Sequence, residues 1–147
     1  MPNRVQPNVL LILTDQQRVD TLSSYGGRFC QTPHLDALAR ESVQFDRAYC
    51  VAPLCTPARA SLQTGLYPSR HGMQNNIYYP GCAVHELPDS PRLLSRQLER
   101  VGYAAGFTGK WHLGFGRHKP DNFEWRRHLG WHDYPQAWLD AGTLPSD

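Results

Sequence analysis

The feature that most constrains this chain is an unbroken apolar run near its start. Residues 8–14 carry five consecutive apolar side chains, Val-Leu-Leu-Ile-Leu, and the run stops at Asp15. A strand that is apolar at every position, rather than at alternate ones, is typical of a parallel sheet covered on both faces. The run is too short to cross a bilayer, which needs about 20 apolar residues. It therefore predicts a buried strand with a carboxylate at its end.

Helix and strand signals alternate along the rest of the chain. The segment Thr32-Pro33 predicts a helix that fades near Ser42, and residues 43–49 predict a second strand. Residues 66–91 are rich in proline and predict an extended loop. Further elements are expected from their caps and periodicity: a helix from Pro57 to Gly65 with Thr56 as its cap, a helix from Pro91 to Val101, and a strand over 103–108. This order predicts an α/β fold with a doubly wound, mostly parallel sheet flanked by helices.

Composition excludes several classes of partner and site. The 147 residues carry a net charge of +2 without a concentrated basic stretch, so a nucleic-acid interface is not expected. The sequence shows neither a secretory signal nor a membrane span, which predicts a cytoplasmic protein with no membrane partner. The cysteines contain no C-x-x-C pair, so neither structural zinc nor disulfides are expected; they are Cys30, Cys50, Cys55 and Cys82.

Polar residues follow the first and third predicted strands. Asp15 ends the first strand, and Lys110 and His112 come directly after the third. Because ligands of open parallel sheets bind beyond the carboxyl ends of the strands, we expect these side chains at one edge. Cys55 and Arg59 flank a predicted helix start, where free N–H groups favour anions. A nucleophile and an arginine at a helix start predict a site for transferring a tetrahedral oxyanion such as sulfate or phosphate.

Two longer motifs contain these residues. Residues 53–59 read Pro-Leu-Cys-Thr-Pro-Ala-Arg, and residues 102–112 read Gly-Tyr-Ala-Ala-Gly-Phe-Thr-Gly-Lys-Trp-His. The first resembles the C-x-P-x-R signature of the type I sulfatases, of the alkaline-phosphatase-like superfamily, and the second resembles that family's second signature. The likeness implies that residues 1–114 are the N-terminal part of a sulfatase catalytic domain. Residues 115–147, whose Trp and His follow no clean period, are expected to be an irregular, truncated continuation of it.

The resemblance implies a modified nucleophile. In sulfatases the signature cysteine, here Cys55, is converted after synthesis to formylglycine, so a formylglycine-generating enzyme is an implied partner. The aldehyde hydrates to a geminal diol, of which one hydroxyl attacks sulfur and expels the alcohol. Deprotonation of the other hydroxyl then releases sulfate and restores the aldehyde. The implied activity is the hydrolysis of a small-molecule or saccharide sulfate ester.

The resemblance also implies a divalent cation, with Ca²⁺ favoured over Mg²⁺. Its implied ligands are Asp15, Gln16 and the side chain of residue 55, since oxygen donors suit hard cations. Many sulfatases carry two consecutive acids here, whereas this chain has Asp15-Gln16. Glutamine at this position occurs in choline-sulfatase-like members and in phosphonate monoester hydrolases. A phosphonate or phosphate diester hydrolase of the same superfamily is therefore the alternative function.

Four further residues match catalytic or substrate-binding positions of the family. Arg59 is implied to hold the nucleophile in its reactive form. Lys110 and His112 are implied to contact the sulfate and to offset charge on the leaving oxygen. Asn76 falls where some members place a substrate-binding asparagine. The phosphonate monoester hydrolases lack the lysine and histidine matched by Lys110 and His112, which favours a sulfatase.

The later half of sulfatases supplies further metal-binding and catalytic residues, and none of them can be located in this sequence. We therefore expect an N-terminal segment of a sulfatase that does not turn over alone. The alternative of another class is an inactive truncated protein that binds an anion or a partner. The particular sulfate ester and the oligomeric state are not fixed by the sequence.

Overall fold

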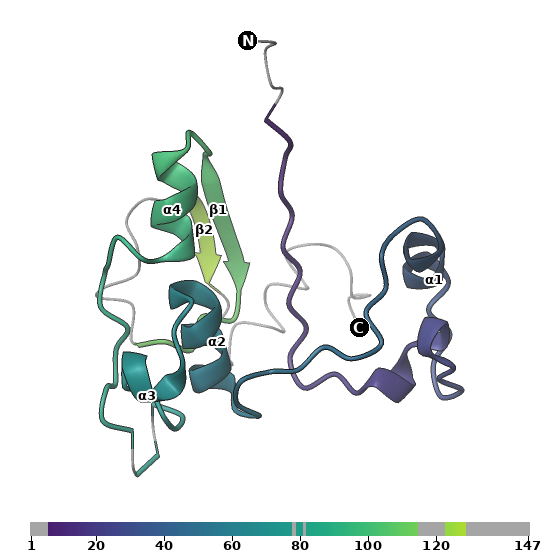
Figure 1. The fold of residues 1–147 in the computed structure, drawn as a ribbon, viewed down its shortest axis with the longest axis horizontal. Helices are drawn as coiled ribbons and strands as arrows, with labels where there is room; N and C mark the ends of the chain where they lie inside the picture. Colours follow the sequence, from purple (N-terminus) through teal and green to yellow (C-terminus); the bar gives the residue numbers. More distant parts are fainter. Residues whose placement is uncertain (1–5, 78, 81, 115–122, 129–147) are drawn as a thin grey trace, which may run out of the picture. The chain divides into compact units, whose positions relative to one another are not determined.

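The computed structural model describes residues 6–77, 79–80, 82–114 and 123–128 (Figure 1). The chain divides into two compact units, residues 1–49 and 50–147. The first unit contains the 3-10 helices η1 (Val19–Thr21) and η2 (Ser23–Tyr25) and the helix α1 (Pro33–Arg40). The second contains α2 (Cys55–Thr64), α3 (Pro68–His71), α4 (Leu94–Arg100), β1 (Ala105–Gly109) and β2 (Phe123–His128). Within the described residues no helix is long and apolar enough to cross a membrane.

In the first unit, α1 begins where the sequence predicts, with Pro33 in its first turn and Thr32 as N-cap. The Thr32 hydroxyl does not cap the helix backbone but donates to Asp36 Oδ1 at 3.0 Å. The Ser23 hydroxyl donates to the other carboxylate oxygen at 2.6 Å. These hydrogen bonds lower the pKa of Asp36 because they stabilise its charged form, and the bond from Ser23 has the largest effect. The carboxylate thus connects η2 to α1.

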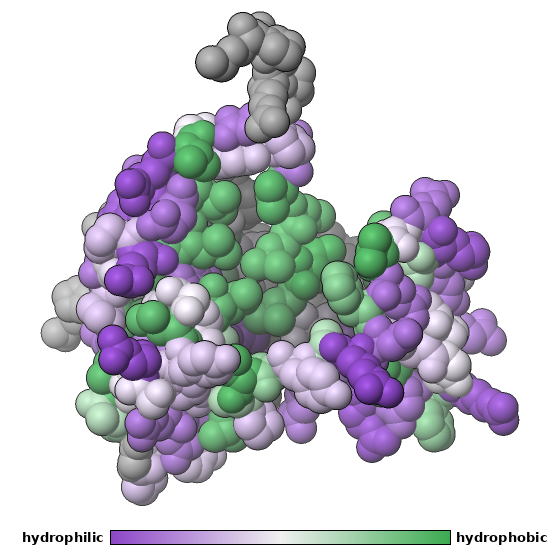
Figure 2. Space-filling view, in the orientation of Figure 1, coloured by the Kyte–Doolittle hydropathy of each residue, from purple (hydrophilic) through white to green (hydrophobic). Residues whose placement is uncertain are grey.

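The predicted strands over residues 8–14 and 43–49 are wrong for the described structure. Neither segment is in a strand, and the apolar side chains of residues 9–13 are 52–84% exposed. A strand requires a neighbour that pairs with its N–H and C=O groups, and no described segment of the first unit does so. Apolar character alone therefore leaves these segments extended and unpaired. Exposed apolar side chains are visible as green surface in Figure 2.

In the second unit, α2 begins two residues before the predicted start at Pro57. Cys55 is its first residue and Leu54 its N-cap, so Pro57 lies in the first turn, where a missing N–H costs no helical hydrogen bond. The helix ends as predicted at Gly65, which adopts the left-handed conformation with φ 68°. The helix α3 lies within the segment predicted to be an extended loop, and α2 and α3 pack together (Figure 1).

A two-stranded parallel sheet follows α4. The strand β1 matches the prediction for residues 103–108 with a small shift, and α4 is shorter than predicted because residues 91–92 form a turn. The strand β2 lies in the segment predicted to be irregular, so that prediction is wrong for residues 123–128. Its register runs parallel to β1, from Ala105 opposite Phe123 to Gly109 opposite His128. The rest of residues 115–147 lies outside the described part.

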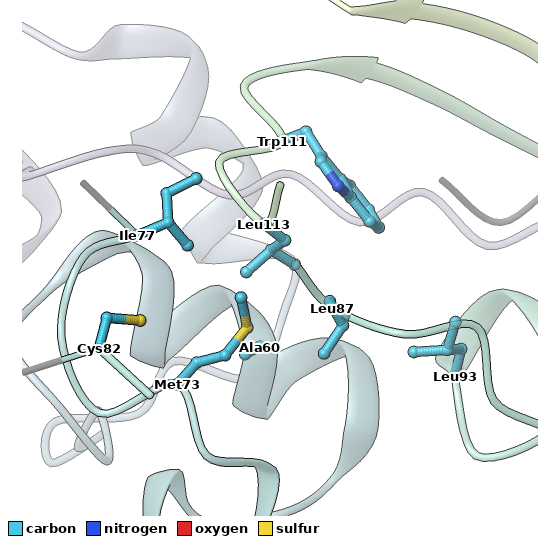
Figure 3. Packing of buried hydrophobic residues seen from close by; sticks show 8 residues of the cluster. All are labelled: Ala60, Met73, Ile77, Cys82, Leu87, Leu93, Trp111 and Leu113. Atoms are coloured by element: carbon cyan, nitrogen blue, oxygen red, sulfur yellow. The ribbon is translucent and has the colours of Figure 1, made fainter. Parts of the chain in front are cut away.

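The core of the second unit joins the helices to the segment that follows β1. Its members come from α2, the loops around α3 and α4, and the end of β1 (Figure 3). The central side chains Ala60, Met73 and Leu113 are at most 1% exposed. Trp111 is 3% exposed and packs edge-on against Phe107, with ring centroids 5.3 Å apart. The other members are Ile77, Cys82, Leu87 and Leu93.

Truncation of Leu113 should destabilise this core. We expect Leu113→Ala to lower the free energy of unfolding by about 2–5 kcal/mol, because the removed atoms leave a cavity in a fully buried site. Urea unfolding measures the change. Val101→Ala is the matched control: Val101 is 61% exposed, so its truncation should cost less than about 0.5 kcal/mol. Equal losses for the two variants would contradict the assignment of the core.

Candidate active site

The first turn of α2 carries the predicted nucleophile position. Cys55 is the first residue of the helix and is half-buried, and Leu54 supplies no side-chain cap. The backbone N–H groups of a helix's first turn have no partners within the helix, and the helix dipole adds partial positive charge. The side chain of residue 55 therefore lies at an end of α2 that favours negative charge.

Two segments distant in sequence hold this turn through Thr56, which is fully buried. The Thr56 N–H donates to Asn76 Oδ1 at 3.0 Å, so the asparagine side chain caps the helix from outside it. The Thr56 hydroxyl donates to the His112 carbonyl at 2.9 Å. A buried donor without an acceptor would cost about 1–3 kcal/mol, so these two bonds fix the start of α2.

The segment after β1 brings Lys110 to this turn, and Arg59 of α2 bonds to the same segment. Lys110 Nζ donates to Cys55 Sγ at 3.3 Å, and the Arg59 guanidinium donates to the Lys110 carbonyl. Gly109, with φ 99°, ends β1 in a conformation that favours glycine. The Lys110 ammonium thus contacts the Cys55 side chain directly, and the Arg59 guanidinium contacts the backbone of Lys110.

Side chains alternate between core and site along this segment. Trp111 and Leu113 are buried, whereas Lys110 and His112 are half-buried. The interpretation of Trp111 as a packing residue is confirmed by its contact with Phe107. His112 adopts a left-handed backbone with φ 56°, which costs a non-glycine residue about 1–3 kcal/mol. The hydrogen bond from Thr56 to the His112 carbonyl helps hold that conformation.

The structure brings five of the predicted site residues into two hydrogen-bonded sets that meet at the adjacent residues Cys55 and Thr56. They are Cys55, Arg59, Asn76, Lys110 and His112. The link through His112 is its carbonyl, bonded to Thr56. The Asn76 side-chain oxygen accepts from the helix backbone. Its predicted contact with substrate stays a prediction.

The predicted metal ligands Asp15 and Gln16 belong to the first unit, and residue 55 belongs to the second. Both Asp15 and Gln16 are exposed, and Gln16 has a left-handed backbone with φ 52°. No group of three or more His, Cys, Asp or Glu side chains suited to a metal occurs among the described residues. Ligation of a cation by Asp15 together with residue 55 therefore stays a prediction.

Sequence analysis missed one polar contact beside α2. His71, the last residue of α3, places Nε2 3.0 Å from the Ser61 hydroxyl, and its Nδ1 accepts from the Met73 N–H at 3.1 Å. The sequence carries no period that pairs residues 61 and 71, because their contact depends on the turn between α2 and α3. Burial lowers the pKa of His71.

Comparison with known proteins assigns the chain to a family. A family model described as Sulfatase matches residues 7–146. The steryl-sulfatase of Mus musculus is 44% identical over 112 residues, which are 74% of this chain and 18% of the mouse protein. The N-acetylgalactosamine-6-sulfatase of Homo sapiens is 41% identical over 120 residues, which are 78% of this chain and 22% of the human protein. The chain thus spans about a fifth of the length of these relatives.

Two solved structures extend the comparison to the fold. The phosphonate monoester hydrolase of Agrobacterium radiobacter matches with a TM-score of 0.71 and 31% identity, over 95% of this chain and 29% of that chain. A protein solved in complex with its substrate D-glucosamine-2-N,6-O-disulfate matches with a TM-score of 0.69 and 32% identity, over 81% of this chain and 22% of that chain. These matches confirm the predicted α/β, alkaline-phosphatase-like fold class.

Removal of the external cap should loosen the start of α2. We expect Asn76→Ala to lower the free energy of unfolding by about 1–2 kcal/mol, because the buried Thr56 N–H loses its acceptor. Asn76→Asp keeps an oxygen at that position and should lose less. Urea unfolding and hydrogen exchange of the Thr56 amide measure both effects. Gln74→Ala, at an exposed neighbouring position, is the control, and unchanged Thr56 exchange in Asn76→Ala would contradict the cap.

Proposed function

The chain belongs to the sulfatase family, and on this premise we propose that the complete protein hydrolyses a sulfate ester of a small molecule or saccharide. The observation that carries the proposal is the first turn of α2, where Lys110 Nζ lies 3.3 Å from Cys55 Sγ. A cation at a helix N-terminus favours an anionic group beside residue 55. The sulfatases among the relatives, at 41–44% identity, support sulfate as that group.

The cationic side chains have separable tasks in this proposal. Lys110 is close enough to residue 55 to contact a sulfate group bound there and to offset negative charge that develops on the leaving oxygen. Arg59 positions Lys110 through its hydrogen bond to the Lys110 carbonyl. His112 follows Lys110 by two residues, and its imidazole is proposed to contact the sulfate from the same segment. Asn76 is proposed to contact substrate through its amide NH₂, since its oxygen accepts from Thr56.

Residue 55 is proposed to be formylglycine in the mature protein, formed from Cys55 by a formylglycine-generating enzyme. When present, the group supplies a geminal diol as nucleophile, which splits ester cleavage into two easier steps. The chain's contribution is positional. Asn76 and the His112 carbonyl hold the adjacent Thr56, so the side chain of residue 55 is held close to the Lys110 ammonium.

A divalent cation is the second proposed component. Asp15 supplies a carboxylate and Gln16 an amide oxygen, and such hard oxygen donors fit Ca²⁺, which we favour, or Mg²⁺. When bound, the cation would polarise oxygen at residue 55 and at the sulfate. The left-handed backbone of Gln16 marks a sharp bend directly after Asp15, which is where the extended apolar segment ends.

A phosphonate or phosphate diester hydrolase is the second candidate function. Two observations favour it: the Asp15-Gln16 pair in place of two acids, and the fold match to a phosphonate monoester hydrolase over 95% of the chain. Against it stands the contact of Lys110 with residue 55, because Lys110 and His112 match positions typical of sulfatases. The sulfatase function therefore accounts for more of the described site.

Modification of residue 55 can be read from one peptide. Trypsin releases residues 48–59, which contain both Cys50 and Cys55, from the complete protein co-expressed with a formylglycine-generating enzyme. We expect mass spectrometry to show residue 55 with its thiol sulfur and two hydrogens replaced by one oxygen, whereas Cys50 is unchanged. Cys55→Ala should abolish sulfate-ester hydrolysis and Cys50→Ala should retain it. An unmodified Cys55 in every molecule would contradict the assignment.

Paired substrates separate the two candidate functions. We expect the complete protein to hydrolyse an aryl sulfate with kcat/KM about tenfold or more above that for the matching aryl phosphodiester, a difference of about 1.4 kcal/mol in transition-state binding. Lys110→Met should reduce the sulfate rate more than the diester rate. A preference for the diester would assign the chain to the alternative.

A further inference from the structure

The hydrogen bonds of the His71 side chain, which lies beside α2, determine which of its two ring nitrogens carries a proton. His71 ends α3 and is followed by Gly72 in the left-handed conformation with φ 79°. The Met73 N–H points at Nδ1, 3.1 Å away, and a backbone amide can only donate. Nδ1 must therefore be an acceptor, and Nε2 carries the proton and donates to the Ser61 hydroxyl at 3.0 Å. The ring is neutral in this geometry.

The His71 ring joins α2 to the core of the second unit. Ser61 lies one helical turn after Pro57 on α2, and the Pro57 backbone acts to raise the pKa of the His71 ring, against the larger effect of burial. Met73, on the other side of the ring, is fully buried in the core of the second unit (Figure 3). Both Pro57 and Ser61 flank Arg59, which bonds to the Lys110 carbonyl. The His71 ring therefore fixes the part of α2 from which Arg59 reaches the site.

We propose that His71 is a positioning residue for the reaction at residue 55: in its neutral form it holds the first two turns of α2 against the core, and its protonation releases them. The proposal rests on the proposed function for the reaction itself. The imidazolium carries a proton on both nitrogens, so Nδ1–H would oppose the Met73 N–H. Protonation thus removes the bond to Met73 rather than strengthening it.

A second histidine of the same unit provides the contrast. His85 Nδ1 lies 2.6 Å from the Ile77 carbonyl, which only accepts, so this bond persists when His85 is protonated. The hydroxyl and the amide that bond to the His71 ring are both uncharged: they belong to Ser61 and Met73. The titratable or charged groups on the elements around it are Cys55 and Arg59 of α2, Arg70 of α3, and Cys82, His85 and Glu86 of the following loop.

The direction of the pH effect follows from burial. Burial lowers the pKa of His71 below its ordinary value of about 6.5 because it disfavours the charged ring. The unfolded chain then binds the proton more readily than the folded one, so stability rises with pH through this window. The neutral His71 ring makes its full contribution to the free energy of unfolding above about pH 6.5. This contribution is lost as the pH falls through the lower pKa of the folded state.

Three substitutions of His71 in the complete protein test the proposal. His71→Asn places an oxygen near the position of Nδ1 and keeps the Met73 bond, but it has no imidazole to protonate. We expect His71→Ala to lower kcat for an aryl sulfate by about tenfold, the equivalent of about one hydrogen bond, and His71→Asn to recover most of that loss. His71→Gln, which keeps a donor near Ser61 but loses the acceptor, should recover less. His85→Asn is the matched control and should match the parent.

Two readouts separate positioning from general stability. In the parent protein, the protection factors of the Met73 and Thr56 amides, which correct each exchange rate for its intrinsic pH dependence, should fall as the pH falls from about 7 to 5, and in His71→Asn they should not. Nitrogen NMR of the ring should show the proton on Nε2. Equal kcat for the Asn and Ala variants, or a parent-like pH response in His71→Asn, would overturn the proposal. If the parent cleaves no sulfate ester, the proposed function fails, whereas the exchange and NMR results still decide the role of His71.

Discussion

The site depends on the burial of Thr56 in the first turn of α2. Its N–H and hydroxyl each need an acceptor, and the acceptors come from Asn76 and from the His112 carbonyl, 20 and 56 residues away. Because an unpaired buried donor costs about 1–3 kcal/mol, these bonds favour the packing that brings the three segments together. The position of residue 55, one residue earlier, follows from that requirement.

The segment after β1 serves the core and the site together. Trp111 and Leu113 fill the core, whereas Lys110 and His112 between and beside them are only half-buried. Packing of the buried pair therefore sets where the Lys110 ammonium lies relative to Cys55. Arg59 adds a bond to the same backbone from α2, so α2 and the segment after β1 are joined at Cys55, at Thr56 and at Arg59.

Local signals predicted the elements that carry their own start and stop residues. The helix α1 follows Thr32-Pro33, and α2 ends at Gly65, as glycine after a helix predicts. In the structure Gly65 has a φ of 68°. The prediction fails where an element depends on a remote partner. The apolar run at residues 8–14 has no described strand beside it, and β2 exists because β1 pairs with it in parallel. The helix start at Cys55 likewise depends on Asn76, which no local pattern indicates.

The sequence by itself determined the family and predicted the nucleophile position at Cys55 with its cationic neighbours, because two motifs carry these residues in fixed order. Only the tertiary structure decided that Asn76 caps α2, that Lys110 contacts residue 55 and that the His71 ring bonds to Ser61 and Met73. A motif records which residues are present and at what spacing. Which donor meets which acceptor depends on how distant segments pack, since burial makes each unpaired polar group costly.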